Sequence, residues 1–435
     1  MKKKILKNGL VYVDEELKKV NILIIGEKIV GISESSFEGD DVIDCKGKWI
    51  LPGCIDPHVH FRCPGMEYKE DWITGSQSAV SGGVTTVLDM PNTNPPTSTV
   101  KRLLEKRELV KKDSIVNYGF HFAALIDNIE EIENVKNIAS VKVYFGSSTG
   151  NLLVNDHSYL DRLLKVTKYP ICFHAENEEI IKGNEDKYRA EAIYNPLIHG
   201  KIRSEYAAEM AVREILELTK DYNNKIYFCH TSTRKEIELI EKARASREVY
   251  CEATPHHIFL NEEILKKIGN YAKVNPPLRK EEDRVYLYNA LLNNKIDTIG
   301  SDHAPHNKLE KENEYFEAPS GMPGVATLVP LLLSEVYKGK LSISQFVKLT
   351  SNNTATIFSI RNKGEIKLDY DADIIVVNPN EKYKIKSDFL FSKANWSPYE
   401  NWELCGRIEK TFVLGNLAFD MGKCNKINGK EISYL

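Results

Sequence analysis

The segment that decides the fold runs from residue 53 to residue 60 and reads Gly53-Cys54-Ile55-Asp56-Pro57-His58-Val59-His60. It is a short, largely apolar run of the kind that predicts a buried β-strand, and it ends in two histidines. Residues two apart on a strand point to the same side, so the imidazoles of His58 and His60 can reach one cation. The segment therefore predicts a strand with a metal-binding end.

Seven further apolar runs follow this one, and stretches with helical periodicity at 100–112, 204–218 and 281–292 alternate with them. The eight predicted strands are 53–60, 84–90, 115–123, 141–145, 171–174, 226–230, 249–254 and 297–302. The alternation is typical of βα units and a parallel sheet. Eight such units over about 300 residues predict an α/β fold of the TIM type, a (β/α)8 barrel.

Both ends of the chain differ from this middle part. Short strands separated by turn residues are predicted at 10–13, 20–25, 29–32 and 42–43, and again at 372–377 and 411–414. Two strand-rich ends around a long middle indicate that both termini build one small β-sandwich domain. We expect residues 1–52 with 358–435 to form this domain and residues 53–357 to form the barrel.

Bulk properties limit the classes of function. A chain of 435 residues suits a barrel with a smaller second domain. The net charge of −3 provides no electrostatic basis for binding nucleic acid. No apolar stretch approaches the roughly 20 residues of a transmembrane helix. The eight cysteines contain no C-x-x-C pair and several lie in strand-like runs, so we expect reduced thiols in a cytoplasmic protein without nucleic-acid or membrane partners.

Residues that bind metals recur at the ends of the predicted strands. His174 ends the fifth strand, His230 the sixth and Asp302 the eighth. A barrel places its active site at the carboxyl ends of its strands, so these side chains should converge with His58 and His60. A single histidine beside a strand is more often structural. The complete set, each residue in the position that a barrel site requires, favours a metal centre.

Lys142 lies in Val141-Lys142-Val143-Tyr144, on a strand that should be buried. An unpaired buried ammonium is costly, which favours the neutral amine. A neutral amine can add CO₂ to form a carbamate, and a carbamate can bridge two cations about 3.5–4 Å apart. The alternative is a lysine that extends to solvent from the strand edge. Opposite the two histidines of the first strand, we favour the carbamate.

These residues together resemble the amidohydrolase superfamily, and within it the dihydroorotase family. The resemblance runs from about residue 40 to 380 and includes Ala372-Asp373-Ile374. The metal motifs resemble the whole superfamily, whereas the surroundings of Arg62, Asn92 and His306 resemble dihydroorotases in particular. The phrases that carry it are 58–65 (His-Val-His-Phe-Arg-Cys-Pro-Gly), 90–96 (Met-Pro-Asn-Thr-Asn-Pro-Pro), 274–279 (Val-Asn-Pro-Pro-Leu-Arg) and 301–306 (Ser-Asp-His-Ala-Pro-His).

The resemblance implies two zinc ions. It assigns His58, His60 and Asp302 to the first ion and His174 and His230 to the second, and a carbamate on Lys142 would bridge them. Some related proteins use an aspartate as the bridge. Here the next acidic residue after Lys142 is Asp156, so the bridge is assigned to Lys142. Whether one or two metal ions are needed differs within the family.

The resemblance also implies a substrate and a mechanism. Dihydroorotate would be hydrolysed reversibly to N-carbamoyl-L-aspartate, a step of pyrimidine synthesis, with Asp302 as general base and then acid. The guanidinium of Arg62 would donate two parallel hydrogen bonds to the substrate carboxylate, and Asn92 and His306 would also contact it. Asn275 would contact the ring amide, together with the backbone of residues 319–324.

Other interpretations remain open from the sequence. A hydantoinase or allantoinase would share the metal ligands, and a non-catalytic subunit that scaffolds aspartate transcarbamoylase would have lost them. The loop at 146–151, with its glycines and serines, is either a lid over the substrate or a plain βα turn. We expect a homo-oligomer, with a dimer as the commonest arrangement, and association with aspartate transcarbamoylase is an open alternative.

Overall fold

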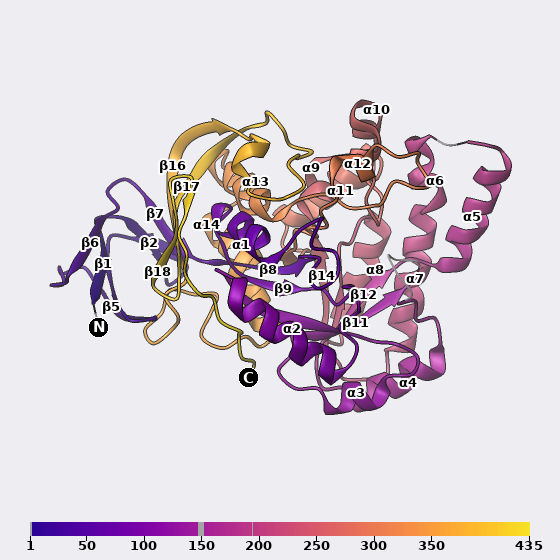
Figure 1. Cartoon of the computed structure of the whole chain (residues 1–435), viewed down its shortest axis with the longest axis horizontal. Helices are drawn as coiled ribbons and strands as arrows, with labels where there is room; N and C mark the ends of the chain where they lie inside the picture. Colours follow the sequence, from indigo (N-terminus) through magenta and orange to yellow (C-terminus); the bar gives the residue numbers. More distant parts are fainter. Residues whose placement is uncertain (1, 147–151, 194) are drawn as a thin grey trace.

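The structure, a computed structural model, describes residues 2–146, 152–193 and 195–435. Its central element is a sheet of eight parallel strands whose spatial order follows the sequence (Figure 1). A parallel bridge between Val59 and His303, with the His60 amide donating to the His303 carbonyl at 2.9 Å, joins the eighth strand to the first. The predicted (β/α)8 barrel is therefore confirmed. Its strands are β8 (Cys54–Val59), β9 (Val84–Asp89), β10 (Asn117–Ala123), β11 (Ser140–Phe145), β12 (Ile171–Ala175), β13 (Ile226–Phe228), β14 (Val249–Ala253) and β15 (Thr298–Ile299).

Two barrel strands are shorter than predicted. The sixth ends at Phe228 and the eighth at Ile299, so His230 and Asp302 lie in the turns that follow them. Both residues have left-handed backbones, with φ of 36° and 45°. An extended strand cannot continue through such a conformation, which is why each strand stops before its functional residue.

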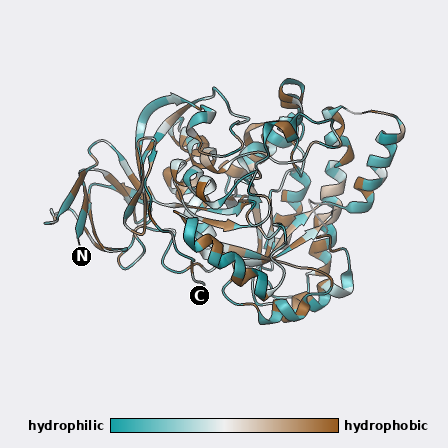
Figure 2. Cartoon of the chain, in the orientation of Figure 1, coloured by the Kyte–Doolittle hydropathy of each residue, from teal (hydrophilic) through white to brown (hydrophobic). Residues whose placement is uncertain are grey.

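Helices surround the barrel, and their outer faces are hydrophilic while the strands are largely hydrophobic (Figure 2). The strands are buried on both faces, which explains their near-continuous apolar sequences. The predicted helices at 100–112, 204–218 and 281–292 correspond to α2 (Val100–Asp113), α7 (Glu205–Leu218) and α11 (Glu281–Leu292). The longer helices are α1 (Trp72–Ser81), α2 (Val100–Asp113), α4 (His157–Val166), α5 (Glu178–Ala190), α7 (Glu205–Leu218), α8 (Arg234–Arg244), α11 (Glu281–Leu292) and α13 (Val325–Tyr337); shorter ones include α3 (Ile129–Asn134), α9 (Pro255–Phe259), α12 (Lys308–Lys311), α14 (Ile343–Val347) and α15 (Asn353–Ile357).

Side-chain caps begin several of these helices where a strand-to-helix loop ends. Asp71, Thr99 and Asp156 each accept a hydrogen bond from a backbone amide in the first turn of α1, α2 and α4. Such caps satisfy amides that have no partner inside the helix. They set the point at which each loop above the barrel turns into its helix.

Two further sheets form the strand-rich part of the molecule, to the left in Figure 1. A four-stranded sheet has the order β5-β4-β1-β6, and a seven-stranded sheet has the order β19-β18-β17-β16-β7-β2-β3. The second sheet joins both ends of the chain, because β7 pairs with β16. The strands are β1 (Lys3–Lys7), β2 (Leu10–Val13), β3 (Glu16–Lys18), β4 (Asn21–Ile25), β5 (Lys28–Ser33), β6 (Asp41–Asp44), β7 (Trp49–Pro52), β16 (Ile374–Lys384), β17 (Glu403–Val413), β18 (Asn416–Asp420) and β19 (Lys423–Cys424).

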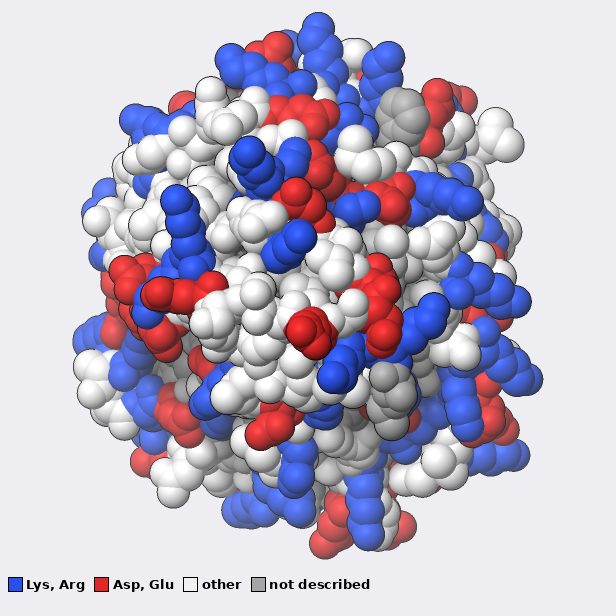
Figure 3. Space-filling model, turned by 90° about the vertical axis from the view of Figure 1, so that its left-hand side faces the viewer, with Lys and Arg blue, Asp and Glu red and all other residues white. Residues whose placement is uncertain are grey.

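The end of the chain leaves this sheet and lies against the barrel. The Tyr118 amide of β10 donates to the Lys430 carbonyl at 3.0 Å, and Ile432 is buried. On the face shown in Figure 3, basic and acidic side chains are interspersed. Within the described ranges, no helix is long and apolar enough to cross a membrane.

Candidate metal and substrate site

One cavity at the carboxyl ends of the barrel strands contains nine of the ten predicted site residues. They are His58, His60, Arg62, Asn92, Lys142, His174, His230, Asn275 and Asp302, and the cavity is completed by Tyr144, Ala304, Ser320 and Gly321. The tenth residue, His306, lies beside Arg62, with its Nε2 3.1 Å from Arg62 Nη2. The topology thus brings together residues far apart in the sequence, such as Arg62 and His306, which are 244 positions apart.

Three of these residues surround one point. Asp302 Oδ1 lies 3.0 Å from His60 Nε2 and 3.4 Å from His58 Nε2. Burial alone would raise the pKa of Asp302, but His58 and the hydrogen bond from His60 outweigh it and lower the pKa to about 2. The carboxylate is therefore ionised at neutral pH. Burial also lowers the pKa of His58 well below its usual value, so its imidazole is neutral.

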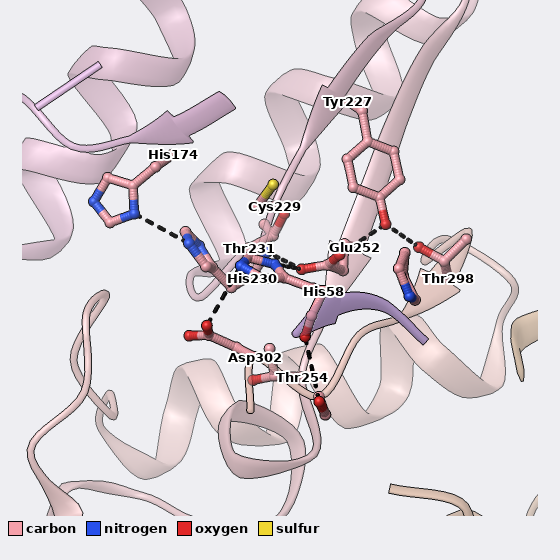
Figure 4. Close-up of polar contacts among 12 residues, drawn as sticks. His58, His174, Tyr227, Cys229, His230, Thr231, Glu252, Thr254, Thr298 and Asp302 are labelled. Carbon is pink, nitrogen blue, oxygen red and sulfur yellow. Dashed lines mark hydrogen bonds and ion pairs between the residues drawn. The ribbon is translucent and has the colours of Figure 1, made fainter. Parts of the chain in front are cut away.

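A second group lies beside the first. His174 Nδ1 is 3.0 Å from His230 Nε2, as Figure 4 shows. Burial lowers the pKa of both imidazoles, so both are neutral. His230 also joins the first group, because His58, His230 and Asp302 offer ligand atoms within 4.8 Å of one another. The two groups therefore form one continuous cluster.

Lys142 lies on β11, where its neighbour on β12 is Cys172. Its side chain is 1% exposed, and its Nζ lies 2.8 Å from Cys229 Sγ. Among the described residues, no carboxylate forms an ion pair with it. A lysine that reaches solvent from the strand edge, the alternative considered from the sequence, does not fit this burial.

Glu252 on β14 is a supporting residue that the sequence did not single out. His58 Nδ1–H donates to its Oε1 at 2.8 Å, the His230 amide donates to the same oxygen at 2.9 Å, and the Tyr227 hydroxyl donates to Oε2 at 2.8 Å (Figure 4). Burial raises the pKa of Glu252 to about 7. By holding the Nδ1 proton, Glu252 leaves the Nε2 lone pair of His58 directed to the cavity. The signal in the sequence that could have identified Glu252 was its acidic side chain inside the predicted strand 249–254.

Glu176 supports the other group in the same way. Its Oε2 lies 3.1 Å from His174 Nε2 and accepts from Arg203 Nε at 3.0 Å. Because Glu176 holds the Nε2 proton, the Nδ1 lone pair of His174 is directed towards His230. Asn92 orients His60 in a similar way, because its Oδ1 accepts a hydrogen bond from His60 Nδ1 at 2.6 Å. Each of these hydrogen bonds fixes one imidazole tautomer.

Imidazole and carboxylate donors that converge in this way fit a divalent metal ion such as zinc. Two observations support the fit. His174 Nδ1 and His230 Nε2 lie 3.0 Å apart, so both imidazoles can offer a nitrogen to one cation. The other ring nitrogens of His58, His60 and His174 are held by oxygen acceptors, as is usual for histidines that bind metals.

Replacing Glu252 with glutamine is expected to weaken metal binding by about 10- to 100-fold, the usual effect of removing such a supporting carboxylate. The neutral amide is a poorer acceptor for the His58 Nδ1 proton. Titration of metal-free protein with zinc, followed by calorimetry, measures the change. Glu248→Gln, on the loop before β14, is the matched control. Equal zinc affinity for wild type and Glu252→Gln would contradict the supporting role.

Arg62 places a buried positive charge in the cavity. It is 4% exposed and has a left-handed backbone, with φ of 61°. In the part of the chain that the structure describes, no carboxylate forms an ion pair with it, and its Nε has no hydrogen-bond partner. Burial lowers the pKa of Arg62, although a guanidinium stays charged in proteins. A buried cation without an anion is a place for an anionic ligand.

The residues around Arg62 are also ordered by hydrogen bonds. Burial, with the charges of Arg62 and Lys69 nearby, lowers the pKa of His306 to about 3, so His306 is neutral. The Oδ1 of Asn275 accepts from His199 Nε2 at 3.0 Å, which leaves the Asn275 NH₂ group to donate to a ligand. The loop predicted at 146–151 cannot be placed as lid or turn, because 147–151 lie outside the described residues.

A cluster of side chains that can bind metal ions, at the carboxyl end of a (β/α)8 barrel and beside a strand-rich domain, is typical of a class of hydrolases. The sequence model of the Amidohydrolase family matches residues 49–418, and the chain belongs to this family. Proteins named dihydroorotase are among its relatives. That of Methanosphaera stadtmanae is 38% identical over 95% of this chain and 96% of its own length, and that of Methanosarcina acetivorans is 37% identical over 92% and 88%.

Solved structures with the same fold include proteins named hydantoinase or dihydropyrimidinase. The L-hydantoinase (dihydropyrimidinase) of Arthrobacter aurescens has a TM-score of 0.95 and 26% identity, with 100% of both chains covered. The dihydropyrimidinase of Brevibacillus agri has a TM-score of 0.92 and 28% identity, covering 99% of this chain and 98% of its own.

Proposed function

We propose that this chain is a dihydroorotase, which hydrolyses (S)-dihydroorotate reversibly to N-carbamoyl-L-aspartate in pyrimidine synthesis. The observation that carries the proposal is the buried Arg62 guanidinium, which has no carboxylate partner among the described residues and lines the same cavity as the metal-type cluster. Dihydroorotate has a cyclic amide to be cleaved and a carboxylate to meet this charge. The names of the relatives at 37–38% identity support the same activity.

The residues around Arg62 would hold the substrate carboxylate. The guanidinium donates two parallel hydrogen bonds to a carboxylate, and the Asn92 NH₂ group and His306 complete the pocket. Asn275 would donate to the ring amide, next to the backbone of Ser320 and Gly321, which line the cavity. In this arrangement the carboxylate fixes the ring so that its amide carbonyl faces the histidines.

We infer two zinc ions as the cofactor. His58, His60 and Asp302 would hold one and His174 and His230 the other, with a carbamate on Lys142 as the bridge. The burial of Lys142 in the same cavity as the histidines and the absence of an acidic partner among the described residues support the carbamate. Bound metal ions of this kind lower the pKa of water to near neutrality and polarise the carbonyl that is attacked.

Asp302 would move the proton in both halves of the reaction. Its ionised carboxylate takes a proton from the water whose oxygen adds to the ring carbonyl carbon. When the carbon–nitrogen bond of the ring breaks, Asp302 gives this proton to the departing nitrogen. In the reverse direction the same group takes the proton from the ureido nitrogen as the ring closes.

A hydantoinase is the second candidate, because solved hydantoinase structures have the same fold over the whole chain. A hydantoin or dihydropyrimidine ring has no carboxylate, and it would leave Arg62 buried and unpaired. The identity is also lower, at 26–28% compared with 37–38% for the relatives named dihydroorotase. A non-catalytic scaffold is disfavoured because all six ligand positions are filled and line one cavity.

The experiment is hydrolysis of L-dihydroorotate by the purified protein, with hydantoin and allantoin as parallel substrates. Turnover of dihydroorotate is expected, with loss of at least about 99% of activity on chelation and recovery on addition of zinc. Turnover restricted to a neutral ring would replace the proposal with the hydantoinase. Bound zinc without turnover of any substrate would favour the scaffold.

A further inference from the structure

Tyr144 is a residue of the cavity to which the proposed mechanism gives no part. It lies on β11, two residues after Lys142, and therefore on the same side of the strand. Its side chain is 3% exposed, and it lines the cavity with the metal-type ligands. Its hydroxyl is buried without a hydrogen-bond partner among the residues that the structure describes.

The ring of Tyr144 is held firmly in place. It packs in a small apolar cluster with Ala123 and Leu152. In the register of the barrel, Tyr144 is the neighbour of His174 on β12, and the two ring centroids are 6.3 Å apart. The Lys142 Nζ lies 5.3 Å from the centroid of the Tyr144 ring. The hydroxyl is thus carried by a fixed ring beside the ligands of the second metal.

A phenylalanine would fill this apolar cluster equally well, so packing does not require the hydroxyl. A buried hydroxyl that lacks a partner loses its hydrogen bonds to water without replacement. Such a group is stabilised when a ligand supplies an acceptor. Tyrosine hydroxyls remain protonated at neutral pH, so this one is a donor.

The position of Tyr144 on the barrel indicates which part of the substrate its hydroxyl contacts. Arg62 follows β8, Asn92 follows β9 and His306 follows β15, and these three strands adjoin one another around the closed barrel. β11 and β12 lie on the other side of the mouth. A substrate whose carboxylate is bound by Arg62 therefore presents the opposite part of its ring, with the amide carbonyl, to Tyr144 and His174.

We propose that the Tyr144 hydroxyl donates a hydrogen bond to the carbonyl oxygen of the ring amide that is cleaved. This inference rests on the proposed dihydroorotase function. The hydrogen bond strengthens when water adds to the carbonyl carbon, because the oxygen then gains negative charge. Tyr144 is accordingly a catalytic residue that favours the transition state over the bound substrate.

The test is the variant Tyr144→Phe, which keeps the ring and removes only the donor. The expected result is a fall in kcat of about 10- to 100-fold, with KM within about threefold of wild type. Hydrolysis and ring closure share one transition state, so kcat/KM should fall by the same factor in both directions. Tyr434→Phe is the matched control, and its kinetics should equal wild type. The Tyr434 hydroxyl is also buried without a partner among the described residues, but it lies near Gly119, outside the cavity.

Metal content and thermal unfolding are measured on each variant as independent readouts. An unchanged kcat in Tyr144→Phe would overturn the inference, as would a rise in KM alone, which would mean that the hydroxyl binds the ground state. A loss of bound metal in Tyr144→Phe would assign any slower rate to assembly of the site and would also overturn it. Failure of the wild-type protein to hydrolyse dihydroorotate would instead refute the proposed function, and with it this role.

Discussion

Asp302→Asn is expected to lower the turnover of dihydroorotate by about 10³-fold, the size of effect that loss of a general acid–base group produces. The amide is nearly isosteric with the carboxylate but cannot take the proton from water or return it to the ring nitrogen. In the native protein His58 and His60 overcome the effect of burial and hold the pKa of Asp302 at about 2. The carboxylate is thus ionised throughout the neutral range. Initial rates with saturating metal measure the loss.

The fold should survive this change, because Asp302 lies in a turn after β15 and its partners are cavity residues. Circular dichroism and thermal unfolding check this point. Asp161→Asn, on the exposed side of α4 where Asp161 pairs with Lys165, is the matched control and should keep wild-type rates. A variant at Asp302 that retains more than about a tenth of the wild-type rate would remove this residue from its catalytic role.

Arg62→Met is expected to lower kcat/KM for dihydroorotate by about 10²- to 10³-fold, mainly through KM, since a buried charge-assisted contact is lost. The same change should leave the unfolding temperature equal or higher. In the free protein the guanidinium is buried, and no carboxylate of the described residues pairs with it. Removing a buried charge that has no counter-ion relieves a desolvation penalty. Steady-state kinetics and calorimetry measure the two effects.

Arg107→Met provides the opposite pattern as a control. Arg107 Nε pairs with Glu431 at 2.8 Å, and its Nη2 donates to the carbonyls of Lys136 and Asn137. Its loss should lower the unfolding temperature and leave KM unchanged. If Arg62→Met also unfolded at a lower temperature and kept its KM, Arg62 would be a structural residue, and the argument for a carboxylated substrate would fail.

The sequence by itself determined the barrel and predicted which residues line the cavity at its mouth. Alternating apolar strands and amphipathic helices are local patterns, and they predicted α2, α7 and α11 almost to the residue. The two histidines of 53–60 were recognisable because the period of a strand is two residues. His174, His230 and Asp302 were identified because the fold, once predicted, says which ends of the strands meet.

The tertiary structure decided how these residues are held. Glu252 on β14 orients His58 on β8, and nothing in its local sequence says which imidazole it meets. Glu176 orients His174 from the turn that directly follows β12. The left-handed backbones of His230 and Asp302 end two of the regular strands earlier than predicted. Likewise, only the tertiary structure shows that, among the described residues, the Tyr144 hydroxyl has no hydrogen-bond partner and Arg62 has no carboxylate partner. A local pattern specifies what a residue can do, but only packing between distant segments specifies which partners it finds and which it lacks.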